Sequence, residues 1–482
     1  MELSIIIPTY NEEKNIEELI SGIKRVLATE QISFEILVVD VGSTDNTQKI
    51  ARESGAEVLL QKLPGYGGAL KEGFTRAKGN WIVTMDADFS HDPLFIKELL
   101  KNRKKGELIV ASRYIQGGSS GGQFFRRILS IILNRVFVFI LSLPYKDISS
   151  GFRMYNKKAI QAIDIKGENF DVLEEILLKI HAEGYRVVEI PFDYKTRKSG
   201  KSHAKLFKFA VSYIKTLYKM WKLRNSLFSA DYDIRAYNSR ILIQRYWQRK
   251  RYNVIMNFIH DRARILDIGC GSSKIIRSLP DAVGLDIQLK KLRYLKETNK
   301  FLVKGRIEEL PFGNEKFETV ICSEVIEHIK FDKVVFTEIS RVLQKGGVLI
   351  IGTPDYGRLL WRIFEFGYKK LIPGGYADKH ITQYTRKNLI KLLREEGFDI
   401  QKYTYILGAE VIIQAVKKDT TTSSPTAPWQ IKDILACPKC KRSVIEKKEE
   451  FTCPVCNLAF TMKDGIPDML IEEATKIVNE QK

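Results

Sequence analysis

The 482-residue sequence predicts an α/β fold with two doubly wound domains and a small cysteine-rich domain at the C-terminal end. Between residues 1 and 110, β-rich runs such as 4–8, 35–40 and 81–88 alternate with helical patterns, which is typical of a mainly parallel sheet. A second alternation, with its own glycine turn, begins at residue 264. Four of the six cysteines then follow as two CxxC pairs, which indicates a metal-stabilised domain.

These patterns place the domain boundaries. We expect the first domain at residues 1–228 and the second at 229–418. The stretch KKDTTTSSPTAPWQ is polar and rich in Thr, Ser and Pro, so we expect a linker over 419–430. The small domain then occupies residues 431–475.

Composition and charge narrow the class of protein. Hydrophobic residues make up 44% and charged residues 28% of the chain, an ordinary globular balance. The net charge of +20 favours an anionic partner, which is nucleic acid, anionic lipid or a phosphorylated substrate. The clustered cysteines indicate a reducing compartment. The N-terminus lacks signal-peptide features and no apolar run reaches 18 residues, so we expect a cytoplasmic chain without a transmembrane helix.

Residues 201–224 carry seven Lys or Arg and no acid. On a helical wheel the lysines share an arc of about 100°, and aromatic and aliphatic residues fill the remainder. This pattern predicts an amphipathic helix in the membrane interface, peripheral at the cytoplasmic face; the alternative is a helix packed on its own domain. The lysines are Lys201, Lys205, Lys208, Lys215, Lys219 and Lys222. Residues 124–143 are a second candidate, with Arg126, Arg127, Ser130 and Asn134 on one side.

The sequence MDAD places Asp86 and Asp88 at the end of a predicted strand. Two carboxylates separated by one residue can hold Mg²⁺ or Mn²⁺ and bridge it to a diphosphate. A nucleotide-sugar enzyme needs such an ion, because its leaving nucleoside diphosphate develops negative charge. The alternative is that these acids cap a helix or pair with lysine.

Seven segments strengthen the first interpretation. They are SIIIPTYNEEKNI, VVDVGSTDNT, GYGGALKEG, MDADFSHDP, SRYIQGG, DISSGFRMY and RKSGKSHAKL, in that order. Over residues 3 to 225 the chain resembles family 2 glycosyltransferases of the GT-A fold, and within them the dolichyl-phosphate mannosyltransferases and their polyprenyl-phosphate relatives. The resemblance implies a nucleotide sugar, GDP-mannose, as donor, polyprenyl or dolichyl phosphate as acceptor, and inversion at the anomeric carbon. Glucose, N-acetylhexosamine and an undecaprenyl carrier stay open, as does a membrane-protein partner.

The same resemblance implies roles for individual residues. Pro8, Tyr10, Glu12 and Asp40 would line the nucleotide pocket, Asp86 and Asp88 would hold the metal, and Arg113, Arg126, Arg197 and Ser202 would contact phosphates. A phosphate acceptor is already anionic, so aligning and screening two anions matters more than a strong base. The chain departs from the family at Val41, where a second Asp is usual, and at Ser90, where Gln is common.

The segment ILDIGCGSS places a glycine turn directly after a β run, and Asp286 ends the next strand. Such an acid can accept both ribose hydroxyls of a nucleoside. With EELPF, CSEVIEHI and RVLQKGGVLIIGTP, residues 250–418 resemble a Rossmann-like class I S-adenosylmethionine (SAM)-dependent methyltransferase. The implied cofactor contacts are Asp267, Gly269, Gly271, Asp286 and Glu308. His328 and His380 either face the substrate or are structural.

The pattern CPKC-x12-CPVC supplies four thiolates as Cys437, Cys440, Cys453 and Cys456. This spacing predicts a structural Zn²⁺ site. Residues 431–470 resemble the small zinc-ribbon subunit that activates several RNA and translation-factor methyltransferases, which implies a partner role here; the alternative is a passive zinc fold.

Three functions for the whole chain follow. The first is a bifunctional enzyme at a membrane surface that makes a polyprenyl-phosphate sugar and methylates a glycan or lipid of the same pathway. The second is an RNA- or protein-modifying methyltransferase activated by its own zinc ribbon. The third treats the C-terminal domains as binding modules only. The lysine arc and the glycosyltransferase motifs favour the first, and the sequence offers no RNA-recognition motif with interleaved aromatics, so we do not expect a nucleic-acid partner.

Overall fold

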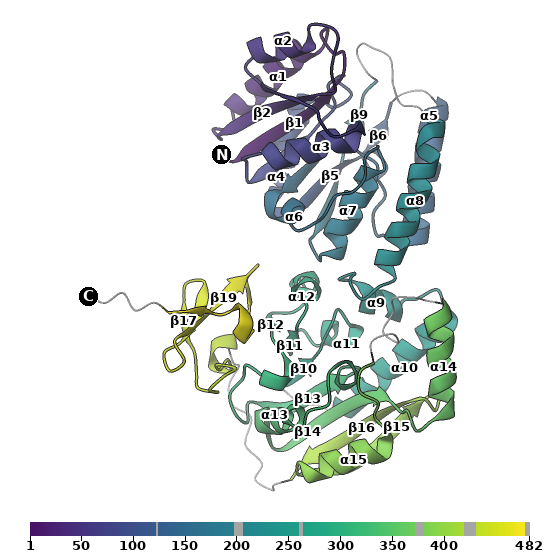
Figure 1. Ribbon diagram of the computed structural model, residues 1–482, viewed down its shortest axis with the longest axis vertical. Coiled ribbons are helices and arrows are strands. Elements are labelled where there is room, and N and C mark those ends of the chain that lie inside the picture. Colours follow the sequence, from purple (N-terminus) through teal and green to yellow (C-terminus); the bar gives the residue numbers. More distant parts are fainter. Residues whose placement is uncertain (122–123, 197–205, 260–263, 372–379, 419–429, 478–482) are drawn as a thin grey trace, which may run out of the picture. The chain divides into compact units, whose positions relative to one another are not determined.

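The computed structural model describes residues 1–121, 124–196, 206–259, 264–371, 380–418 and 430–477 (Figure 1). The chain divides into two compact units, Met1–Arg224 and Asn225–Lys482. Each unit is built on a seven-stranded sheet, which confirms the predicted α/β class.

The first unit has the strand order β3-β2-β1-β4-β7-β5-β8. The strands β3, β2, β1 and β4 are parallel, and β7 runs antiparallel to both β4 and β5. The strands are β1 (Leu3–Thr9), β2 (Phe34–Asp40), β3 (Glu57–Leu60), β4 (Trp81–Thr84), β5 (Leu108–Ser112), β7 (Arg153–Asn156) and β8 (Val187–Pro191), with a separate pair β6 (Ser119–Ser120) and β9 (Asp193–Tyr194). The helices are α1 (Ile16–Ala28), α2 (Thr47–Glu53), α3 (Gly65–Arg76), α4 (Ile96–Asn102), α5 (Phe124–Leu141), α6 (Lys157–Gln161), α7 (Val172–Ala182) and α8 (Leu206–Arg224).

Helix α1 shows why these segments fold as they do. Its buried side chains recur every three or four residues, so one apolar stripe faces the sheet. Glu17 and Glu18 occupy its first turn, where acidic groups interact favourably with the helix dipole.

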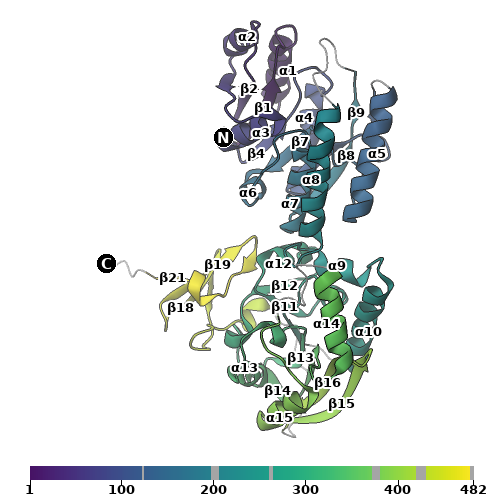
Figure 2. The ribbon, with the colours of Figure 1, turned by 45° about the vertical axis from the view of Figure 1, so that its right-hand side comes forward.

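Helix α8 lies beside α5 in the views of Figures 1 and 2, and the two helices are in contact. Part of its apolar face packs on its own unit, since Tyr213, Leu217 and Trp221 contact the core and Met220 is buried. Ile214 and Tyr218 remain exposed, at 67% and 56%. Lys201 and Lys205 lie outside the described residues. None of the described helices is both long enough and apolar enough to cross a membrane.

The second unit has the strand order β12-β11-β10-β13-β14-β16-β15. Its first five strands are parallel, and β16 is antiparallel to its neighbours β14 and β15. The strands are β10 (Ile265–Ile268), β11 (Val283–Asp286), β12 (Phe301–Lys304), β13 (Phe317–Ser323), β14 (Leu343–Pro354), β15 (Phe398–Ile406) and β16 (Glu410–Lys417). The helices are α9 (Tyr232–Tyr237), α10 (Leu242–Ile259), α11 (Lys274–Arg277), α12 (Leu289–Leu295), α13 (Val334–Val342), α14 (Leu359–Leu371) and α15 (Arg386–Glu395).

The cysteine-rich segment folds into antiparallel strands within the second unit. These are β17 (Ile445–Lys447), β18 (Glu450–Cys453), β19 (Leu458–Lys463), β20 (Ile466–Pro467) and β21 (Thr475–Lys476). The segment packs on the edge strand β12, where Met469 N–H donates to the Lys304 carbonyl at 2.8 Å. Phe451 and Phe460 share one apolar core with Phe312. The ribbon and the α/β sheet of this unit therefore stabilise one another.

Candidate active sites

Polar motifs of the first unit gather at one edge of its sheet. Asp40 ends β2, Asp86 follows β4 by two residues, and Arg113 directly follows β5. Because β7 runs in the opposite direction, the 147–151 loop before it reaches the same edge. Motifs far apart in sequence therefore converge where parallel α/β sheets bind ligands.

The two aspartates differ in exposure. The side chain of Asp86 is 38% exposed, whereas Asp88 is 6% exposed. The Asp86 backbone N–H donates to His91 Nδ1 at 2.9 Å, and His91 Nε2 lies 3.7 Å from the Asp86 carboxylate. Burial lowers the pKa of His91, although Asp86 acts in the opposite direction, so this imidazole is neutral. A pair of carboxylates beside a neutral imidazole fits a hard divalent ion.

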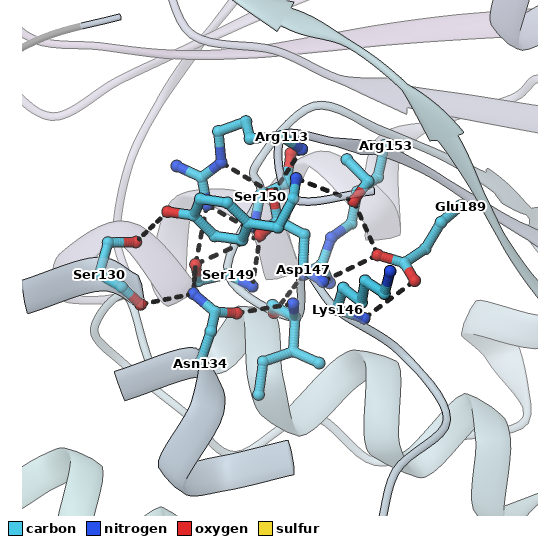
Figure 3. A network of polar contacts seen from close by, with 12 residues as sticks. Arg113, Ser130, Asn134, Lys146, Asp147, Ser149, Ser150, Arg153 and Glu189 are labelled. Carbon is cyan, nitrogen blue, oxygen red and sulfur yellow. Dashed lines mark hydrogen bonds and ion pairs between the residues drawn. The ribbon is translucent and has the colours of Figure 1, made fainter. Parts of the chain in front are cut away.

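Arg113 is held by an acid that the sequence analysis did not single out. Its Nε and Nη2 donate to the two oxygens of Asp147, both at 2.8 Å, and Nη2 also donates to Ser149 at 2.9 Å (Figure 3). Asp147 is fully buried. Burial alone would raise its pKa, but the hydrogen bonds and charge of Arg113 outweigh burial and lower it. Asp147 opens the DISSG motif, and an acid at the start of a loop motif is the signal that could have identified it.

Helix α5 is tied to the same loop (Figure 3). Asn134 donates to Ser149 Oγ at 2.7 Å and accepts from the Ile148 N–H at 2.8 Å. Tyr114, next to Arg113, donates to Ser130 Oγ at 2.9 Å. The polar side of the helix predicted from Ser130 and Asn134 therefore positions the Arg113–Asp147 pair.

The four residues carried over to the nucleotide pocket lie on β1, β2 and the turns that follow. Tyr10 is 40% exposed, and Pro8 and Glu12 are half-buried. Asp40 is fully buried, and its carboxylate accepts from the N–H groups of Gly42 and Ser43. Its carboxylate orders the loop that begins at Val41.

The remaining phosphate-contact candidates are less fully described. Arg126 lies in α5, of which the structure describes only the backbone at this position. Arg197 and Ser202 lie outside the described residues.

In the second unit, the glycine turn follows β10 next to the point where the strand order reverses. Gly269 and Gly271 have positive φ angles of 64° and 55°, which favour glycine. Asp286 accepts from the Gly271 N–H at 2.9 Å. Oδ2 of the buried Asp267 has no hydrogen-bond partner among the described residues. Burial, together with Asp286, raises the pKa of Asp267 to about 8. The Asp267 oxygen can accept a hydrogen bond from a ligand, and Asp286 ends β11. Both features fit a nucleoside cofactor such as SAM.

Glu308 and Asp233 lie on either side of this turn in sequence. Glu308 is half-buried in a short 3-10 helix, Ile307–Glu309, just after β12. Asp233, from α9, accepts from the Ser272 N–H at 2.9 Å and pairs with Lys291 at 3.0 Å. Asp233 could not be predicted from the sequence, because it lies 38 positions before Gly271 and no local motif marks it.

Three glutamates lie near the end of β13. Arg251 pairs with Glu410 at 2.7 Å and Glu324 at 3.2 Å. Burial raises the pKa of the third, Glu327, to about 8. The rings of His328 and His380 lie beside it, with centroids 4.9 Å apart.

The four cysteines of the ribbon come together as predicted. Their sulfurs all lie within 4.8 Å of one another, and the Cys440 and Cys453 sulfurs are 3.6 Å apart. Four sulfurs at about 2.3 Å from a tetrahedral zinc ion would be about 3.8 Å apart. The four thiols are free of disulfide bonds and can therefore all bind a metal. The distances between their sulfurs fit a tetrahedral Zn²⁺ site.

Comparisons with known proteins bear on both units. Residues 4–164 match the family model for glycosyl transferase family 2, and residues 266–351 match the model for a methyltransferase domain. A dolichol-phosphate mannosyltransferase from Pyrococcus furiosus is 34% identical over 233 residues, covering 46% of this chain and 64% of the relative. The chain thus spans less than two thirds of that relative's length.

A polyprenol monophosphomannose synthase from Mycolicibacterium smegmatis is 31% identical over 220 residues, covering 41% of this chain and 79% of the relative. Among solved structures, a SAM-dependent methyltransferase from Thermotoga maritima, described as a possible histamine N-methyltransferase, covers 38% of this chain and 96% of its own. Its identity is 22% and its TM-score is 0.33.

Proposed function

Because the chain belongs to glycosyl transferase family 2, we propose that it transfers mannose from GDP-mannose to polyprenyl or dolichyl phosphate. The observation that carries this proposal is the position of Asp86 and Asp88, which follow β4 at the sheet edge that also holds the Arg113–Asp147 pair. The two relatives named for mannose transfer to a dolichol or polyprenol carrier support the choice of sugar and acceptor.

Each part of the site has a role in this proposal. Asp86 and Asp88 would hold Mg²⁺ or Mn²⁺, and the ion, when bound, would screen the charge of the leaving nucleoside diphosphate. The acceptor phosphate is anionic without help from a base. Arg126, Arg197 and Ser202 would bind phosphates. The guanidinium of Arg113, held in place by Asp147, would interact with the same phosphates.

The nucleotide would lie on the turns after β1 and β2. Tyr10 presents an exposed ring, and Pro8 and Glu12 flank it. Asp40 would act through the loop whose N–H groups it binds.

We further propose that helices α5 and α8 hold this unit on a membrane surface. Exposed apolar side chains occur on both helices, including Phe139 at 64% and Ile214 at 67%. Exposed cations accompany them on α8, as Lys215, Lys219 and Lys222. Apolar groups beside cations suit the interface of an anionic membrane, where a polyprenyl acceptor resides.

Sugar transfer is tested by incubating the purified chain with Mn²⁺, dolichyl phosphate and a panel of radiolabelled nucleotide sugars. Label from GDP-mannose in the organic phase, abolished by Asp88→Ala, is the expected result. The matched control is Asp164→Ala, because Asp164 is an exposed acid of the same unit. Absence of label from every donor, with undecaprenyl phosphate also tried, would overturn the proposal.

For the second unit we propose SAM-dependent methylation of a glycan or lipid in the same pathway. SAM, when bound, supplies an electrophilic methyl group. Asp286 would hold the ribose, Asp267 would accept a hydrogen bond, and Gly269, Gly271 and Glu308 would line the cofactor. Calorimetric titration with SAM tests this directly, and no binding at millimolar concentration would remove the assignment.

The zinc ribbon favours one alternative strongly enough to test. It contacts β12, the strand that leads to Glu308, so it would support the cofactor site of a methyltransferase acting on RNA or protein. Cell fractionation distinguishes a methyltransferase acting on a glycan or lipid from one acting on RNA or protein. A membrane pellet resistant to high salt supports the glycan or lipid acceptor, whereas association with ribosomes or tRNA supports the alternative.

A further inference from the structure

Among the described residues, one cluster outside the ribbon brings together metal-ligating side chains from distant parts of the chain. Glu327, His328 and His380 each offer a donor atom, and these atoms all lie within 4.8 Å of one another. Glu327 and His328 belong to the 3-10 turn Ile326–His328, just after β13. We propose that they bind a divalent transition-metal ion, which takes a hydroxyl oxygen of the methyl acceptor as a further ligand.

The backbone holds these residues together without a ligand. The Ile381 N–H donates to the Glu327 carbonyl at 2.8 Å, and the Thr382 N–H donates to the same oxygen at 3.1 Å. Thr382 Oγ1 donates to the Ile329 carbonyl at 2.7 Å. The segment that carries His380 is therefore fastened to the turn that carries His328.

Glu327 is poised as a ligand. It is fully buried, and its Oε2 accepts from Thr353 Oγ1 at 3.1 Å. Its Oε1 is buried and has no hydrogen-bond partner among the described residues. A buried carboxylate oxygen left in this state is costly unless a donor or a cation reaches it.

Charge balance points to a divalent cation. Glu327, Glu324 and Glu410 lie around Arg251, and the ion pairs of Arg251 join it to Glu324 and Glu410. Three acids thus lie around one guanidinium. A divalent cation bound to Glu327 would balance the acidic groups that Arg251 does not.

The hydrogen bonds of His380 suit metal ligation. The Tyr356 hydroxyl donates to Glu365 at 3.0 Å and lies 2.8 Å from His380 Nδ1. Because the Tyr356 hydroxyl donates its hydrogen to Glu365, its oxygen can accept a hydrogen bond from Nδ1–H of His380. In that tautomer the lone pair of the ring is on Nε2, which is the atom that would bind a metal. Such second partners commonly fix the orientation and tautomer of ligating histidines. Trp361 stacks on the ring at 5.6 Å and restricts its rotation.

The ligand set indicates which ion and which acceptor. Two imidazoles and one carboxylate suit Zn²⁺, Fe²⁺, Co²⁺ or Ni²⁺ rather than Mg²⁺. At bond lengths of about 2.1 Å the donor atoms would be roughly 3–4 Å apart, so small side-chain rotations would complete the site. Three protein ligands leave coordination positions open, and an acceptor hydroxyl bound there would lose its proton more easily.

The site lies beside the proposed cofactor turn. A Cβ placed on Gly269 would come 2.4 Å from a methyl of Val325, two residues before Glu327. This part of the inference rests on the proposed SAM-dependent activity. The acceptor O–H would give its proton to water, and the oxygen lone pair would form the bond to the methyl carbon. The electrons of the broken C–S bond would remain on sulfur, leaving a thioether.

Metal binding is measured on the full chain carrying Asp88→Ala, so that the first unit contributes no ion. After loading with Co²⁺ and gel filtration, metal content and the visible absorption spectrum are recorded. Glu327→Gln and His380→Ala should each lose about one equivalent of cobalt, together with the weak bands of a nitrogen–oxygen site. The intense thiolate bands of the ribbon should stay, which shows that the variants fold. Gln383→Ala, an exposed neighbour, is the matched control.

Equal cobalt content in all four proteins would overturn the metal site. SAM titration of the same samples separates this inference from the proposed function. If the parent chain binds no SAM but loses cobalt on His380→Ala, the metal site stands and the methyltransferase assignment fails. If SAM binds to every variant and cobalt content never changes, the metal site fails and the methyltransferase assignment stands.

Discussion

Each unit has acidic residues at the carboxyl ends of the parallel strands of its own sheet, but the two units control the charge of these acids differently. In the first unit the carboxylate of Asp147 meets Arg113 in a two-point ion pair, which lowers its pKa against the effect of burial. In the second unit burial and a neighbouring acid, Asp286, together raise the pKa of Asp267 to about 8. The first site therefore holds an ionised acid with its own counter-charge, whereas the second holds an acid that burial keeps protonated.

The largest expected effect comes from breaking the first arrangement. Asp147→Ala leaves the guanidinium of Arg113, 14% exposed, without its partner. Loss of one member of a buried ion pair typically costs about 3–5 kcal/mol. We expect a matching fall in the free energy of unfolding of the first unit, measured by denaturant titration, and loss of sugar transfer.

Two variants sharpen this test. Asp147→Asn preserves the shape but not the charge, so it should fall between the wild type and Asp147→Ala. Asp164→Ala removes an exposed acid, 75% accessible, and should change stability little. An Asp147→Ala protein as stable as the Asp164→Ala protein would mean that the two units do not differ in the way described.

The second expected effect concerns the contact between β12 and the ribbon. Lys304, 7% exposed, pairs with Asp468 at 2.9 Å and Glu473 at 2.7 Å. Because Asp468 also pairs with Lys463, Lys304→Met should cost only about 1–3 kcal/mol. The rate of amide hydrogen exchange should rise in β12 and β20. The substitution should also weaken SAM binding, because β12 leads to Glu308.

Lys300→Met is the control for this experiment. Lys300 pairs with Asp281 at 3.0 Å, but both side chains are more than 70% exposed, so the pair contributes little. Equal exchange rates in the two variants would show that the ribbon does not depend on this contact.

The sequence predicted those parts of the sites that depend on local pattern. Asp86, Asp88 and Asp286 lie at or just after strand ends, and a strand end can be recognised from the residues beside it. The CxxC pairs likewise determine their own geometry, because each knuckle is formed by neighbouring residues. The α/β class followed from the alternation of strands and helices, which is also local.

The parts that sequence analysis missed depend on contacts between distant residues. Arg113 and Asp147 are 34 residues apart, and neither position reveals the other. His380 reaches His328 only through hydrogen bonds to the turn at Glu327. The apolar side of α8 was predicted to face the membrane, yet Tyr213 and Trp221 pack on the core of the unit, where α8 contacts α5 and α7. Helical periodicity identifies an apolar face but not what covers it.

Over a single pH unit, the smallest expected effect is a pH dependence of the second unit. Folded Asp267 stays protonated up to about pH 8, whereas an unfolded Asp ionises near pH 4. Between these values the folded state binds more protons, so the free energy of unfolding falls as pH rises from about 4 to 8. Asp267→Asn removes this contribution, at most about 1.4 kcal/mol per pH unit, so its melting temperature should decline less steeply.

Calorimetric unfolding across this range measures the slopes. Asp281→Asn, an exposed control, should follow the wild type. Parallel slopes for Asp267→Asn and the wild type would show that the pKa of folded Asp267 is not raised.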